Sequence, residues 1–256
     1  MASAIGPDIV TDGLVLSIDP ASTRTNPSSG GTALNNFAGT SGIGGTVVNT
    51  TTSADIVTLD GTNDYITIAG SVTNQELSPQ VATFSIWFKA DAGSFTNTNI
   101  CSLISRGNYN NSGGFFIHMQ RNSSTGACQV SATFSYSKTT SYTYEGTSYY
   151  AVNPFGEWNN ITVTVDGNIK LYANGVLKET KTRSVDTIIY GNGTINTSGD
   201  TDLRWVSALG YAPTLDQGSS GWHPFDGDFG LGFMYNRVLT EAEVVQNYNA
   251  QKLRFI

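Results

Sequence analysis

Oxygen-bearing side chains gather in two short stretches that could hold a metal ion. Asp60, Asn63 and Asp64 lie within one DGTND turn, and Asp226 and Asp228 stand at the start of a late strand-like segment. Calcium takes about six to eight oxygen ligands from carboxylates, amides and carbonyls, so these residues are candidate Ca²⁺ ligands. Asp and Asn also form turns readily, and turn formation alone is the alternative reading of both stretches.

Aromatic side chains form a second candidate site. The segment SYTYEGTSYY (141–150) predicts a ribbon that turns at Glu145-Gly146, and a further aromatic stands in the loop-like GWHPFDG. Sugars stack on exposed aromatic rings beside polar groups, whereas Tyr and Trp are equally enriched where subunits meet. The candidates for glycan or subunit contact are Tyr142, Tyr144, Tyr149, Tyr150 and Trp222.

The composition narrows the class of protein. Only 13% of the residues are charged, against ~25% in ordinary domains, and Gly, Ser, Thr and Asn favour strands and turns over helices. The net charge is −7 without a Lys/Arg cluster, which argues against a nucleic-acid partner. No apolar run approaches the ~20 residues of a membrane span, and no secretory leader is visible, so we expect neither a membrane partner nor export.

Two cysteines, Cys101 and Cys128, are too few for a disulfide framework. Both stand in apolar, strand-like segments, which favours two buried thiols. A single cross-strand disulfide is the alternative. A zinc site would need His118 or His223, and neither has ligand spacing.

Alternation of apolar residues indicates the strands that must position these groups. In TFSIWFKAD (83–91), Phe84, Ile86 and Phe88 face one way and Trp87 the other, which is typical of a strand covered on both sides. Regular turn signals and little helical periodicity elsewhere predict an all-β sandwich or jelly roll. No internal boundary is evident, so residues 1–256 should form one domain, with residues 1–8 as a candidate N-terminal arm.

The segment 158–182 gives the strongest local signal. Apolar and polar residues alternate through WNNITVTV and NIKLYA, and Asp166-Gly167 and Asn174-Gly175 separate three strand-like pieces. Such pairs tolerate positive φ and suit type I′ hairpin turns. We therefore predict a three-stranded meander with two such turns.

The chain closes with a strand and a short helix, expected over residues 240–250. Thr240 can cap this helix, and Glu243 three residues later completes a capping box. Lys252 and Arg254 are expected to follow it as a basic tail. An apolar stripe should lie on the sandwich and consists of Val244, Val245 and Tyr248.

Four stretches, taken together and in this order, resemble the laminin-G-like group of the concanavalin A-like lectin/glucanase fold. They are GTNDYITI (61–68), ATFSIWFKAD (82–91), GEWNNITVTVDGNIKLYANGVLKE (156–179) and FDGDFGLGFMYNRVLTEAEV (225–244). The resemblance implies a concanavalin A-like jelly-roll β-sandwich of two antiparallel sheets with a short C-terminal helix. It also places the two acidic stretches on neighbouring strands, where they would converge. The acidic pair that many members carry in the closing strand is Gly230-Leu231 here, which weakens the case for Ca²⁺.

The two ends of the chain carry a narrower resemblance. IVTDGLVLSIDPAS (9–22) and LTEAEVVQNYNAQKLRF (239–255) are similar to the start and end of laminin-G-like structural proteins of tailed bacteriophages. This implies a virion protein on the particle exterior, a capsid decoration or head protein or a tail-fibre module. It would assemble in the bacterial host cytoplasm, bind other virion subunits and form a homo-oligomer or a capsid-bound layer. The alternative is a lectin-like adhesion module that recognises host surface glycans.

An enzymatic role is not expected. Glycosidases need two carboxylates that flank the sugar, and related glucanases carry them on one strand as E-x-D-x-E. None of the six glutamates begins such a pattern; they are Glu76, Glu145, Glu157, Glu179, Glu241 and Glu243.

Overall fold

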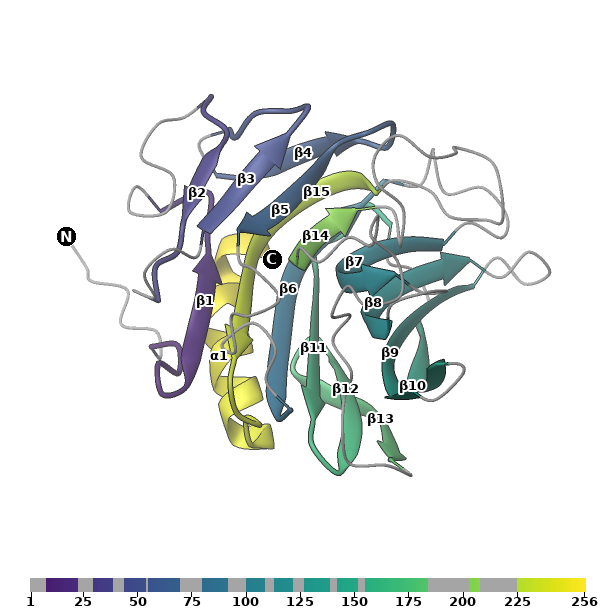
Figure 1. Ribbon diagram of the computed structural model, residues 1–256. Coiled ribbons are helices and arrows are strands. Elements are labelled where there is room, and N and C mark those ends of the chain that lie inside the picture. The colour runs from purple at the N-terminus through teal and green to yellow at the C-terminus, as the bar shows by residue number, and fades with distance from the viewer. Residues whose placement is uncertain are drawn as a thin grey trace.

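The computed structural model forms two antiparallel sheets packed face to face, with one helix against the outside of one sheet (Figure 1). It describes residues 8–22, 30–38, 44–53, 55–69, 80–91, 100–108, 113–121, 127–138, 142–151, 155–183, 203–207 and 225–256. This arrangement confirms the predicted all-β sandwich with a C-terminal helix. No helix within these ranges is long and apolar enough to cross a membrane.

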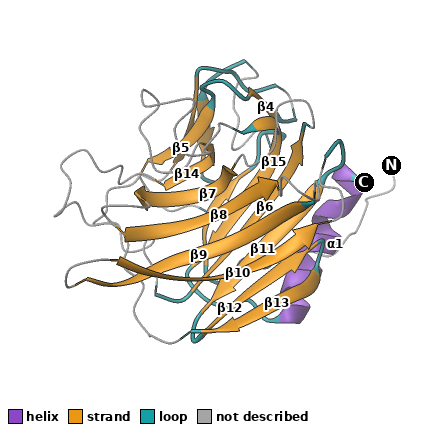
Figure 2. Ribbon diagram, turned by 90° about the vertical axis from the view of Figure 1, so that its right-hand side faces the viewer, coloured by secondary structure: helices purple, strands orange, loops and turns teal. Residues whose placement is uncertain are grey.

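The seven-stranded sheet carries the helix. In spatial order its strands are β1 (Leu14–Ile18), β15 (Asp226–Tyr235), β6 (Ala82–Ala90), β11 (Asn159–Val165), β12 (Asn168–Ala173) and β13 (Val176–Thr182), and β4 (Val57–Asp60) also pairs with β15. The helix α1 (Glu241–Phe255) lies along its outer face (Figure 2).

The eight-stranded sheet forms the other layer. Its spatial order is β10 (Tyr142–Ala151), β9 (Cys128–Lys138), β8 (Gly113–Arg121), β7 (Ile100–Asn108), β14 (Leu203–Ser207), β5 (Tyr65–Ala69), β3 (Gly44–Val48) and β2 (Ala33–Asn35). The order departs repeatedly from sequence order, so the pairing depends on contacts between distant segments.

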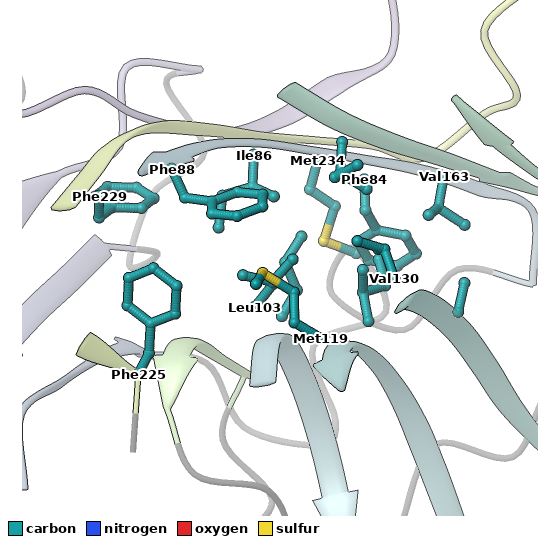
Figure 3. Close-up of a cluster of buried hydrophobic side chains, with 14 of the residues drawn as sticks. Phe84, Ile86, Phe88, Leu103, Met119, Val130, Val163, Phe225, Phe229 and Met234 are labelled. Atoms are coloured by element: carbon teal, nitrogen blue, oxygen red, sulfur yellow. The ribbon is translucent and has the colours of Figure 1, made fainter. Parts of the chain in front are cut away.

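The main core fills the space between the sheets (Figure 3). From β6, Phe84, Ile86 and Phe88 point into it, and the Phe84 ring lies 4.5 Å from that of Phe115 on β8. Trp87 points the opposite way into a second buried cluster beneath α1. The prediction that this strand is covered on both faces is therefore confirmed.

The meander is present, but only one of its turns is of the predicted type. Asn174 and Gly175 have φ of 50° and 76°, as a type I′ turn requires. Asp166 and Gly167 do not have positive φ. Instead, the Asp166 carboxylate accepts a hydrogen bond from the Asn168 amide at 2.7 Å, a local Asx turn that closes the loop without left-handed backbone.

The aromatic ribbon does not turn at Glu145-Gly146. Residues 142–151 form the single strand β10, in which Glu145 and Gly146 pair with Phe134 and Thr133 of β9. The glycine instead allows close packing of the strands, because a Cβ there would lie 2.6 Å from the Ala132 carbonyl oxygen.

The helix begins as predicted and runs further. Thr240 is the N-cap and the capping box with Glu243 is complete, but the helix continues to Phe255 rather than ending at 250. Lys252 and Arg254 therefore form its last turn, and the predicted basic tail is wrong. Of the predicted apolar stripe, Val244 is buried and Tyr248 stacks on Trp87, whereas Val245 is exposed.

The two cysteines are free and buried, which confirms the thiol reading. Cys101 lies on β7 and Cys128 on β9, with β8 between them. Burial raises the pKa of both thiols, that of Cys128 to about 11, so both are protonated at neutral pH.

Candidate functional site

The end of α1 divides the outer face of the seven-stranded sheet. Phe255, the last helical residue, stacks on Trp87 with ring centroids 4.6 Å apart and tilts against Trp158 at 4.7 Å. Its ring lies over Gly230, where a Cβ would come within 2.5 Å of it. We call Trp87, Trp158, Gly230 and Phe255 the aromatic socket; beyond it the sheet is no longer covered by the helix.

An open hollow of about 550 Å³ lies at this uncovered end of the sheet. It is formed by β4, the ends of β6 and β15, and the segment around residue 155. We call it the acidic groove, and its lining residues are Thr58, Lys89, Ala90, Asp91, Phe155, Gly156, Asp226, Gly227 and Asp228.

Three side chains on neighbouring strands form the centre of the groove. Thr58, Asp228 and Lys89 face one another across β4, β15 and β6 because the strand registers align them. Lys89 Nζ lies 2.8 Å from Asp228 Oδ2, and the Thr58 hydroxyl donates to Asp228 Oδ1 at 2.9 Å. The Asp228 side chain is 12% exposed and that of Lys89 36%, so this ion pair is open to a ligand from the lysine side.

Backbone contacts hold the floor of the groove. Gly227 has a φ of 138°, and a Cβ at this position would lie 2.1 Å from the Lys89 carbonyl oxygen. Only glycine fits such an approach without displacing β6. The Asp91 amide donates to the Asp226 carbonyl at 3.0 Å, and the Gly156 amide donates to Ala90 at 3.0 Å. These bonds place Phe155 beside the hollow, where its half-buried side chain packs against the main core.

The structure brings the two predicted acidic stretches together. Asp226 is the cross-strand partner of Asp60, and Asp64 Oδ2 accepts a hydrogen bond from the Asp60 amide at 3.0 Å. Asp64 is buried, and its burial raises the pKa of its carboxyl. Asn63 is exposed, and its carbonyl accepts from Asn49 at 2.8 Å. These bonds are the ones that turn formation uses.

The carboxylates do not converge on one point, although they lie near each other. Asp228 is held by Lys89 and Thr58, and Asp60 Oδ1 accepts from the Thr62 amide at 2.8 Å. Across the described ranges, no three His, Cys, Asp or Glu residues form a group that could hold a metal ion. A Ca²⁺ site at these residues stays a prediction.

The aromatic candidates fare differently. Tyr149 is half-buried and packs against the main core, with Lys178 Nζ 5.3 Å from its ring centroid. It thus fills the seam between the sheets and is not an open platform. Tyr142, Tyr144 and Tyr150 lie on β10, but their side chains are outside what the structure describes, as is Trp222.

Sequence reasoning missed most of the groove. It named Asp226 and Asp228 but not Thr58, Lys89 or Phe155, which come from separate parts of the chain. The available signal was the alternation in β6, which places Lys89 on the same outward face as Trp87. The strand registers place Thr58 and Asp228 beside Lys89. No local sequence pattern predicts these registers.

The comparisons with known proteins agree with this architecture. A laminin-G-type family model described as the concanavalin A-like lectin/glucanases superfamily matches residues 60–245. The chain belongs to this superfamily. A search of curated protein sequences found no match.

Several solved structures share the fold of this chain at low sequence identity. The botulinum neurotoxin serotype D binding domain matches with a TM-score of 0.63 and 17% identity over 96% of this chain and 53% of that one. The serotype D ligand binding domain in complex with N-acetylneuraminic acid matches at 0.59 and 16%, over 96% and 52%. The chain therefore spans about half the length of these toxin domains.

A third structure matches over nearly its full length. Domain 4 of AbnA, an extracellular arabinanase from Geobacillus stearothermophilus in complex with arabinotriose, has a TM-score of 0.56 and 16% identity, covering 92% of this chain and 98% of that one. At these identities the likeness establishes the fold.

Proposed function

We propose that the protein is a non-catalytic carbohydrate-binding module and that its ligand occupies the acidic groove. The observation that carries this proposal is an open hollow of about 550 Å³ with an ordered carboxylate, ammonium and hydroxyl at its centre. Its size falls within the range of ~300–1,000 Å³ typical of small-ligand sites.

The groove has the chemistry that sugar hydroxyls need. A hydroxyl both donates and accepts, and here Asp228 accepts while Lys89 donates. The two are already paired, and Lys89 Nζ also lies 5.7 Å from the Trp158 ring centroid, so little side-chain freedom remains to be lost on binding. Phe155 also lines the hollow, but its side chain packs against the main core, so the proposed contacts come from Lys89, Asp228 and Thr58.

The fold relatives support the same class of ligand. One similar structure contains arabinotriose and another N-acetylneuraminic acid. The arabinanase domain is a useful parallel because it corresponds to this chain over most of both lengths. A sugar ligand is the chemistry that these proteins have in common.

The groove is a poor hydrolytic centre. Glycoside hydrolysis needs one protonated acid and one ionised carboxylate on either side of the bond. Asp228 is ion-paired with Lys89, and the raised pKa of Asp64 belongs to a buried side chain that holds its own turn. Binding without turnover is therefore the activity that we propose.

A glycan array followed by calorimetric titration tests this function. The double variant Lys89→Ala/Asp228→Ala removes both partners, so that no unpaired charge is left behind, and we expect about tenfold weaker binding or more. The matched control is Glu179→Ala/Lys181→Ala on exposed β13, which should bind as the parent does. Both variants should give the parent's circular dichroism spectrum. Absence of array hits, or equal loss in the control, would overturn the proposal.

A structural role in a bacteriophage particle is the second candidate. It is favoured by the resemblance of residues 9–22 and 239–255 to phage proteins, because these segments lie largely outside the family match at 60–245. They also meet in space, where Arg254 forms an ion pair with Asp19 at 2.7 Å. Electron cryo-microscopy of purified particles with copy-number counting tests this role. Regular exterior density indicates capsid decoration, a low-copy tail position indicates adhesion, and absence from particles rejects both.

A further inference from the structure

We infer that the acidic groove selects uncharged glycans and rejects those that carry a carboxylate or sulfate. This inference rests on the proposed sugar-binding function and names the ligand class of the same site. It separates this chain from its fold relative with bound N-acetylneuraminic acid, which is an anionic sugar.

The charge balance of the lining is the first reason. Asp91, Asp226 and Asp228 line the hollow against the single ammonium of Lys89. Asp60 lies directly across from Asp226 on the adjoining strand and adds to the negative potential. An anionic sugar entering the hollow would meet this potential at close range, where solvent screening is weakest.

Lys89 already has two partners in the protein. Its Nζ lies 2.8 Å from Asp228 Oδ2 and faces the Trp158 ring on another side. Moving it to a ligand carboxylate would leave the largely buried Asp228 without its counter-charge, which is costly. Lysine has three N–H donors, so it can still donate to an uncharged hydroxyl while it keeps the ion pair.

The next cation along this face also points elsewhere. Arg254, in the last turn of α1, bonds Asp19 at 2.8 Å and the Asp55 carbonyl at 3.0 Å. It also contacts the Gly230 carbonyl oxygen at 3.4 Å and lies over the Phe255 ring, 4.8 Å from the ring centroid. Anion recognition usually employs an arginine fork on the ligand, and the described lining contains no arginine.

Paired ligands that differ by one charge test the inference. We would titrate the protein with lactose and sialyllactose, and with arabinotriose as a further neutral probe, following NMR chemical shifts. In low salt the neutral member of the pair should bind about tenfold more tightly. The ratio of the affinity for lactose to that for sialyllactose should fall toward one as the salt concentration rises, because screening weakens the repulsion.

Charge-removing variants locate the effect. Asp226→Asn should strengthen binding of sialyllactose relative to lactose. Glu179→Gln, an equal change of net charge on exposed β13, should leave the relative affinities unchanged. Tighter binding of sialyllactose, or an equal shift in both variants, overturns the inference while the proposed function stands. Absence of binding by every probe and every array glycan overturns the proposed function and this inference with it.

Discussion

The outer face of the seven-stranded sheet has two unlike halves. Trp87 and Lys89 are two residues apart on β6 and point the same way, yet Trp87 is buried under Tyr248 and Phe255 whereas Lys89 faces an open hollow. The covered half is mostly apolar and aromatic, with Leu231, Phe233 and Tyr235 among its members, and its buried hydroxyls of Ser85 and Thr162 lie 2.9 Å apart. The open half is polar and mostly acidic.

The position of the helix end decides where one half stops. A helix that continued past Phe255 at ~1.5 Å per residue would cover more of this sheet face. Instead Phe255 fills the aromatic socket, and the next residue, Ile256, is the C-cap. One sheet face thus has a packed half and an open half, and the Phe255 side chain lies at the border between them.

Removal of Trp87 should have the largest effect. Trp87→Ala leaves a cavity beneath both Tyr248 and Phe255, and we expect the free energy of unfolding to fall by ~3–5 kcal/mol. The matched change on the open half is Lys89→Ala/Asp228→Ala, which leaves no unpaired charge, so loss of one partly exposed ion pair should cost ~1 kcal/mol or less. Urea unfolding at neutral pH measures both, and equal losses would contradict the division into two halves.

Gly230→Ala tests the border itself. The new Cβ would meet the Phe255 ring within 2.5 Å and the Trp158 ring at 2.9 Å, so overpacking should destabilise the protein by ~1–3 kcal/mol. Gly167→Ala is the control, because nothing lies within 4 Å of its Cβ position.

The double variant Gly230→Ala/Phe255→Ala distinguishes a clash from a backbone effect. If the Phe255 ring is the obstacle, the double variant should lose less than the sum of the two single changes. Strict additivity would instead assign the glycine's role to its own backbone.

The start of α1 was predictable and its end was not, for a physical reason. The capping box joins Thr240 to Glu243, three residues away, so the sequence pattern itself contains both partners. The last turn is held by Asp19, 235 residues before Arg254, and by a socket formed from β6, β15 and Trp158, which directly precedes β11. Residues that appear to be a basic tail in the sequence are thus the anchored end of a helix.

The same limit applies to the groove. Asp226 and Asp228 were identified because carboxylates crowd one short stretch, and the alternation in residues 83–91 predicted that Trp87 faces away from Phe84, Ile86 and Phe88. That Asp228 meets Lys89 and Thr58 follows from strand registers between segments far apart in sequence. Local sequence patterns can identify the residues of a site on a sheet, but they do not predict which of these residues lie next to one another.

Glu243 stabilises the N-terminus of α1, and its contribution to the free energy of unfolding should depend on pH. Its carboxylate accepts from Arg237 Nη1 and Nη2 and from the Thr240 amide, which lowers its pKa from 4.5 to about 2. A lowered pKa in the folded state means that the stabilisation is complete above pH 4.5 and is lost as the pH falls toward 2.

We expect Glu243→Gln to cost ~1 kcal/mol at pH 7 and to cost progressively less between pH 4.5 and 2. Urea unfolding at several pH values measures the difference from the parent. Glu241→Gln, in the same first turn, serves as the control because Glu241 lies outside the capping box. A cost that stays constant down to pH 2 would show that the carboxylate charge does not contribute.

Asp226→Asn should have the smallest effect on stability and the opposite sign. Asp226 stands directly across from Asp60, and like charges in this position oppose folding by ~0.2–1 kcal/mol, so removing one should stabilise the protein slightly in low salt. The gain should vanish near 1 M salt, where the Debye length is ~3 Å. Asp166→Asn removes the same charge at a distant turn and keeps an acceptor for the Asn168 amide, so it should change little. If Asp226→Asn gains stability while losing the preference for uncharged sugars, the open half retains its acidic pair for binding at the expense of folding, whereas Trp87, Tyr248 and Phe255 in the covered half pack against one another.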